Sequence, residues 1–208
     1  MEDIFNLEKI LVQKEGLFGV QPKLPIKSKK TLGMIYTPGV GKICMELKAD
    51  PEKAMTLTNK ANSMFVMTDS SGFSDYDPST WNQDQVIPYL EAKTLYYKCK
   101  ADIDCYPLVL DHLTTKSAQD IYNILDNMSS AYIACELFKI LPERQEDLKK
   151  LLAKKPIDLT IIMDEQRHLI SDKLRTLQCC EVSEKFVISA IMRALMDSRV
   201  YGIVPNDL

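Results

Sequence analysis

Three short apolar segments, each running into an acidic or polar residue, mark out the chain. They are Ser63–Thr68, Pro107–Asp111 and Ile157–Met163. Continuous apolar character over such a length is typical of strands that are buried on both faces of a sheet. Longer segments with apolar residues at helical spacing lie between them. Strands separated by helices predict an α/β fold, with a three-layer arrangement in which helices flank a mostly parallel sheet.

The helical segments follow from apolar residues spaced three and four apart. One of them is predicted to begin at Ser117, because Ser117 and Asp120 have the spacing of a capping box. Another is predicted over 131–141, where Ile133, Leu137 and Leu141 recur every fourth residue. The full set of expected helices is 6–14, 42–48, one starting at Pro51, 82–100, 117–128, 131–141, 143–155, 167–177 and 183–199.

The length of 208 residues is enough for one domain with a sizeable core. Residues 1–33 contain a short helix followed by Gly, Pro and Lys, and we expect them to form an N-terminal arm. We expect residues 34–177 to form the main domain. Residues 178–208 should supply a C-terminal helix that packs back on it, so that the chain is a single domain overall.

Composition narrows the range of partners. A net charge of −3 and a pI near 5.5, with no long basic run, argue against nucleic-acid binding. No apolar run approaches the roughly 20 residues that cross a bilayer, and the acidic start does not resemble a secretory signal. We therefore expect no membrane partner and a cytoplasmic location. The six cysteines lack Cys-x-x-Cys spacing, which favours buried free thiols over zinc sites or disulfides.

Lys93 interrupts an apolar and aromatic stripe on the helix predicted over 82–100. The stripe consists of Val86, Tyr89, Leu90, Tyr96 and Tyr97. A lysine in such a stripe extends its amine to solvent, pairs with an acid, or is desolvated so that its lowered pKa suits it to proton transfer. The pattern leaves all three alternatives open.

Tyr36 stands directly before a turn, Thr37–Gly41, that leads into a helix. Free N–H groups at a helix start can bind a carboxylate or phosphate, although an ordinary loop entering a helix has the same pattern. Acids at the ends of the strands offer a second candidate region, since Asp69, Asp111 and Asp164 would meet at one edge of a parallel sheet. Alternatively, each of them caps the helix that follows.

No dinucleotide site is expected from the glycine pattern. The one Gly-x-Gly is Gly39-Val40-Gly41, and Cys44 stands where the third glycine of a Gly-x-Gly-x-x-Gly motif would be.

Five segments in order resemble the N-terminal, substrate-side domain of malic enzymes, over roughly residues 22–170. They are Pro25–Lys29, Tyr36–Val40, Asp50–Ala54, Thr58–Asn62 and Pro88–Leu95. The resemblance implies roles for particular residues. Tyr36 would be the acid and Lys93 the base, with Asp164 supporting the lysine. Glu136 and Glu165 would be ligands of a divalent cation, Mg²⁺ or Mn²⁺.

The same resemblance shows departures from the family pattern. Leu137 stands where a third carboxylate ligand is expected, and an isobutyl group cannot bind a hard cation, so the expected metal site is degenerate. The family's nucleotide-binding domain is missing, which implies no NAD(P) cofactor. The tail from Thr176 resembles the family's return to its last helix.

Two classes of function remain open on this basis. The first is a non-catalytic interaction or regulatory protein, which binds a protein partner or a second copy of itself. The second is an enzyme without redox chemistry, because Tyr36, Lys93 and Asp164 suffice for keto–enol proton transfer or for decarboxylation of a small dicarboxylate such as oxaloacetate. Binding of a dicarboxylate without turnover lies between them, and a residual malate dehydrogenase activity would need a partner.

Overall fold

The computed structural model describes residues 7–73, 83–111 and 117–163. The chain divides into two compact units. Residues 19–62 make the helical unit, and the residues before and after them make the sheet unit. The boundary expected between residues 33 and 34 falls inside the helical unit. The helices expected over 167–177 and 183–199 lie outside the described residues, as does the C-terminal segment 178–208.

The sheet unit is built on four parallel strands. Their order is β2 (Asp104–Val109), β1 (Ser63–Thr68), β3 (Ala134–Leu137) and β4 (Thr160–Ile162). In the central pairings, Ser63 lies opposite Asp104 and Met64 lies opposite Ala134. The strands β3 and β4 are also parallel. The predicted α/β class with a parallel sheet is confirmed.

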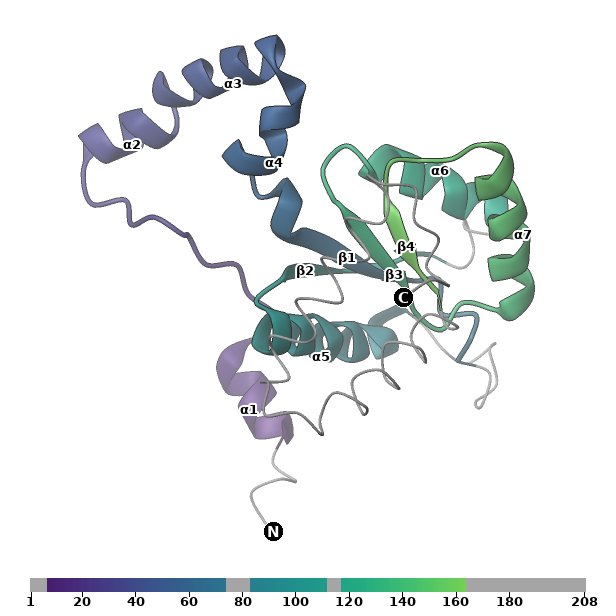
Figure 1. Ribbon diagram of the computed structural model, residues 1–208. Coiled ribbons are helices and arrows are strands. Elements are labelled where there is room, and N and C mark those ends of the chain that lie inside the picture. Colours follow the sequence, from purple (N-terminus) through teal and green to yellow (C-terminus); the bar gives the residue numbers. More distant parts are fainter. Residues whose placement is uncertain (1–6, 74–82, 112–116, 164–208) are drawn as a thin grey trace, which may run out of the picture. The chain divides into compact units, whose positions relative to one another are not determined.

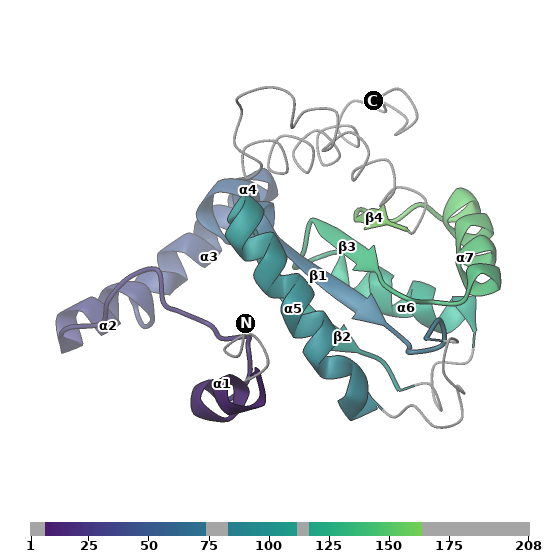
Figure 2. The ribbon, with the colours of Figure 1, turned by 90° about the horizontal axis from the view of Figure 1, so that it is seen from below.

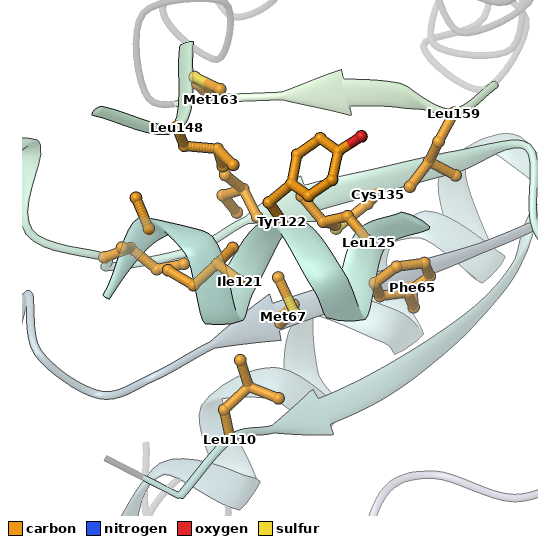
Figure 3. Close-up of a cluster of buried hydrophobic side chains, with 13 residues drawn as sticks. Phe65, Met67, Leu110, Ile121, Tyr122, Leu125, Cys135, Leu148, Leu159 and Met163 are labelled. Atoms are coloured by element: carbon orange, nitrogen blue, oxygen red, sulfur yellow. The ribbon is translucent and has the colours of Figure 1, made fainter. Parts of the chain in front are cut away.

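Helices cover both faces of this sheet. Helix α5 (Gln83–Ala101) lies against one face, and α6 (Ala118–Met128) and α7 (Pro142–Lys154) lie against the other, as Figures 1 and 2 show. Successive side chains of a strand point to opposite faces. In β1, Met64 and Val66 therefore pack on the α5 side, while Phe65 and Met67 join the cluster on the α6 and α7 side (Figure 3).

Residues before the helical unit are anchored to the sheet unit. Helix α1 (Leu7–Lys14) ends before Leu17, whose backbone N–H donates to the Glu91 carboxylate of α5 at 2.9 Å. The next residue, Phe18, packs edge-on against Tyr106 of β2, with ring centroids 5.9 Å apart. The sheet unit therefore includes the start of the described chain.

The helical unit contains no extended core. Its elements are α2 (Lys29–Ile35), α3 (Gly39–Ala49), η2 (Pro51–Lys53), α4 (Ala54–Leu57) and η3 (Lys60–Asn62). None of these five elements buries a residue. Helix α2 had not been predicted, because the surrounding Gly, Pro and Lys residues indicated a loop.

One element was predicted wrongly. The segment 131–141 is not a helix: it contains the strand β3 and the loop that follows it. All four residues of β3 are buried, because helices cover both faces of the sheet. A strand of this kind is apolar at almost every position, so helical spacing can also be found in it. Among the helices within the described ranges, none is long and apolar enough to span a membrane.

Candidate functional site

The strand β3 places a carboxylate inside the protein. Ala134 packs in the cluster on the α5 face, so Glu136, two residues further along the strand, points to the same face. The Glu136 side chain is completely buried, with 0% of its surface exposed. A buried carboxylate is costly unless charged or polar groups compensate it. Its partners therefore decide what this site can do.

Lys93 of α5 is the charged partner of Glu136. Its Nζ lies 2.5 Å from Oε1 of Glu136, and its side chain keeps 22% of its surface exposed. The same ammonium group lies 4.6 Å from the ring centroid of Phe138, within the range of a cation–π contact. Of the three alternatives for Lys93, the structure therefore shows pairing with an acid.

Tyr97 is a second donor to the same carboxylate. Its hydroxyl donates to Oε2 of Glu136 at 2.8 Å, and its side chain is buried. Lys93 and Tyr97 are four residues apart on α5, which places them on one face of the helix one turn apart. The sequence had placed Tyr97 in the apolar stripe without a role. Its spacing from Lys93 was the available signal for a shared acceptor.

The negative charge of Glu136 also acts on a neighbouring strand. Burial is the main cause that raises the pKa of the Cys105 thiol on β2, and the Glu136 carboxylate raises it further. Lys93 acts in the opposite direction and lowers this pKa. The thiol of Cys105 is therefore a neutral neighbour of the ion pair at ordinary pH.

Leu137 points away from this cluster. It is fully buried on the α6 and α7 face, in the same group as Cys135 and Leu148, which are labelled in Figure 3. Adjacent residues of a strand face opposite sides, so the side chains of Glu136 and Leu137 lie on opposite sides of the sheet.

The described residues do not fit a divalent metal site. Glu136 already accepts from Lys93 and Tyr97, Leu137 is apolar and faces the other way, and Glu165 lies outside the described residues. Nowhere within 7–73, 83–111 and 117–163 do three His, Cys, Asp or Glu side chains come close enough together to hold a metal ion.

Tyr36 belongs to the helical unit. It follows α2 as its C-cap, and its side chain is 67% exposed. The tight turn predicted after it is present, since the N–H of Val40 donates to the Tyr36 carbonyl at 2.8 Å. Gly39 is required there, because a Cβ atom would lie 1.8 Å from the Met34 carbonyl oxygen. Tyr36 and Lys93 are thus in different units, and Asp164 lies outside the described residues.

The acid at the end of β1 has a structural role. Asp69 is fully buried, accepts from the N–H of Ser71 at 3.0 Å, and forms an ion pair with Arg144 of α7. Asp111 follows β2 at the same edge of the sheet, since the N–H of Leu110 donates to the Thr68 carbonyl at 2.8 Å.

The loops after the two central strands are joined at that edge. The N–H of Gly72 donates to the Lys139 carbonyl at 2.8 Å, and the N–H of Leu141 donates to the Ser71 hydroxyl at 3.0 Å. Open α/β sheets commonly bind ligands where neighbouring crossovers diverge. In this chain the β1 and β3 loops bond to each other at that position.

No protein-family model matches the chain. Among curated proteins, the NAD-dependent malic enzyme of Geobacillus stearothermophilus is 30% identical over 154 residues, which is 73% of this chain and 30% of the relative. NAD-dependent malic enzyme 1 of Bacillus subtilis is 26% identical over 161 residues, 76% of this chain and 35% of the relative. The chain thus spans about a third of the length of these relatives.

Solved structures agree in fold. The NAD-dependent malic enzyme of Thermotoga maritima superposes with a TM-score of 0.67 at 21% identity, over 84% of this chain and 49% of that one. The four-strand parallel sheet and its flanking helices therefore have a counterpart among malic enzymes.

Proposed function

This chain belongs to the malic enzyme family, and we propose that it acts by binding a protein partner, as an interaction or regulatory protein, rather than by oxidising malate. The observation that carries the proposal is the arrangement around Glu136. The lysine proposed as the base pairs with the carboxylate proposed as a metal ligand, at 2.5 Å. A protonated, ion-paired amine cannot accept a proton until that pair separates.

The environment of Leu137 supports the same conclusion. A metal site for decarboxylation needs several oxygen ligands around one cation. At position 137 this chain has an apolar side chain that belongs to the same buried cluster as Leu148. Introducing a carboxylate there would place a charge among apolar groups and would not bring it to Glu136.

The helical unit supports a role in binding. Several of its large apolar side chains are exposed, the largest fractions belonging to Val20, Leu24, Met34, Tyr36 and Met45. Exposed apolar groups that gather on one part of a protein commonly mark a contact with another protein. We propose a second copy of this chain as the first partner to test.

Turnover is tested with the purified 208-residue chain, L-malate, Mn²⁺ and either NAD⁺ or NADP⁺. We expect no malate-dependent formation of reduced nucleotide. A second assay follows loss of oxaloacetate without nucleotide, because the partly exposed Lys93 amine keeps a redox-free decarboxylase open as the alternative. A rate above the metal-only background that disappears in Lys93→Met would favour that enzyme.

Association is tested by sedimentation velocity over a wide range of protein concentration. Self-association predicts a mass that rises from monomer to dimer with concentration. Met45→Lys, which places a charge on an exposed position of α3, should shift that transition to higher concentration. Lys48→Met is a matched control on the same helix that removes a charge. A monomer at every concentration would exclude the second copy as the partner.

A further inference from the structure

We propose that Tyr97 is a positioning residue, whose hydroxyl fixes the orientation of the Glu136 carboxylate so that this carboxylate stays paired with Lys93. The inference rests on the proposed function only in treating the Lys93–Glu136 pair as structural. Its experiment measures side-chain reactivity and unfolding, so this inference can fail while the turnover and association tests support the proposed function. It can also succeed while those tests contradict the proposed function.

The geometry assigns one donor to each carboxylate oxygen. Lys93 reaches Oε1 at 2.5 Å and Tyr97 reaches Oε2 at 2.8 Å. A carboxylate held at both oxygens cannot turn about its terminal bond without losing one of the two hydrogen bonds. Because both donors come from one helix, a turn apart, α5 sets the plane of the carboxylate as a rigid body.

The difference in exposure explains why Lys93 alone would not be enough. Glu136 is fully buried, whereas Lys93 has 22% of its side-chain surface exposed. A long, flexible lysine side chain with access to water can turn its ammonium group toward solvent. Tyr97 is buried and has few rotamers, so its hydroxyl keeps a fixed position. It therefore adds a fixed donor beside the flexible lysine.

Two groups from other elements act on this pair. The Cys105 thiol of β2 stays protonated, because burial raises its pKa, and a thiol S–H is a weaker hydrogen-bond donor than a phenol hydroxyl. Phe138, which follows β3, faces the ammonium group of Lys93 with its ring. Tyr97 is thus the neutral hydrogen-bond donor to this carboxylate that the described contacts identify.

The experiment compares the wild type with Tyr97→Phe, which removes one oxygen atom and keeps the ring. The rate of Lys93 acylation by a small amine-reactive ester is measured site by site with peptide mass spectrometry. We expect several-fold faster labelling of Lys93 in Tyr97→Phe, because a carboxylate that can turn holds the amine less well. The unfolding midpoint should fall by about 3–10 °C, since a buried hydrogen bond to a charged group is lost.

Tyr96→Phe is the matched control, because Tyr96 is the adjacent residue of the same helix and its side chain is 44% exposed. It should leave both readouts near their wild-type values. The same pair of variants is then made in a Glu136→Gln background, where the carboxylate that pairs with Lys93 is replaced by an amide. There, Tyr97→Phe should change Lys93 labelling little, because its effect passes through the carboxylate.

Unchanged Lys93 labelling in Tyr97→Phe would overturn the proposal, and so would an equal increase in the Glu136→Gln background. If Glu136→Gln does not fold, the comparison of Lys93 labelling in Tyr97→Phe and Tyr96→Phe still tests the proposal. A lower unfolding midpoint with unchanged Lys93 labelling would mean that Tyr97 only packs in the core, which also contradicts the proposal.

Discussion

Replacing Lys93 by methionine removes the ammonium group while keeping a long, unbranched side chain against the sheet. The fully buried carboxylate of Glu136 then loses its charged partner at 2.5 Å and keeps the hydroxyl of Tyr97. Breaking a buried ion pair from one side typically costs about 3–5 kcal/mol, because the remaining charge is uncompensated.

The expected loss for Lys93→Met is in the lower part of that range. Lys93 has 22% of its side-chain surface exposed, so water already screens part of the attraction in the wild type. Tyr97 also continues to donate to the carboxylate. The cation–π contact with Phe138 contributes at most about 1 kcal/mol and is partly replaced by sulfur–aromatic contact. We expect a loss of about 2–4 kcal/mol in the free energy of unfolding.

Urea unfolding followed by circular dichroism measures this loss. Glu136→Gln and the double variant complete a double-mutant cycle with Lys93→Met. The structure predicts that Glu136→Gln costs less than Lys93→Met, because the partly exposed Lys93 can turn to water whereas the fully buried Glu136 cannot. The double variant should therefore be more stable than Lys93→Met alone. A Lys93→Met variant as stable as the wild type, or strictly additive losses, would refute the assignment of this pair as structural.

Two further predictions concern the packing around the site. Gly72→Ala should lower the free energy of unfolding by about 2–4 kcal/mol, because its Cβ would lie 2.5 Å from the Lys139 carbonyl carbon. Gly33→Ala in α2 is the control and should be neutral or stabilising, because a Cβ there meets nothing within 4 Å. Urea unfolding compares the two variants, and equal effects would contradict the close approach of the loops. Cys105 should react with iodoacetamide far more slowly than the exposed Cys99, since burial raises the pKa of the Cys105 thiol. Peptide mass spectrometry measures the reaction at each cysteine separately, and equal rates would contradict the burial of Cys105.

Much of the sheet unit followed from local pattern. The strand Ser63–Thr68 and the helix that begins after Ser117 were predicted with their observed ends, because a buried apolar run and a capping box are signals within a few residues. The stripe on α5 was predicted in part. Val86, Leu90 and Tyr97 are buried, but Tyr89 and Tyr96 lie at its margin and are largely exposed.

The partner of Lys93 could not be predicted. Glu136 is 43 residues away in the sequence and lies in the segment that had been assigned to a helix. In a helix, the side chains of residues 136 and 137 would have projected about 100° apart, so they would not have been directed to opposite sides. In a strand they face opposite sides, and this difference separates the carboxylate from Leu137. The resemblance to malic enzymes identified the residues but not their contacts.

The most direct test of the account is a calorimetric titration of the 208-residue chain with Mn²⁺ in the presence of oxalate, a small dicarboxylate. The account predicts no heat beyond that of the same titration of Mn²⁺ into oxalate without protein, because Lys93 and Tyr97 each donate to an oxygen of Glu136 and Leu137 faces the core. Saturable binding of one Mn²⁺ per chain that is lost in Glu136→Gln would contradict it.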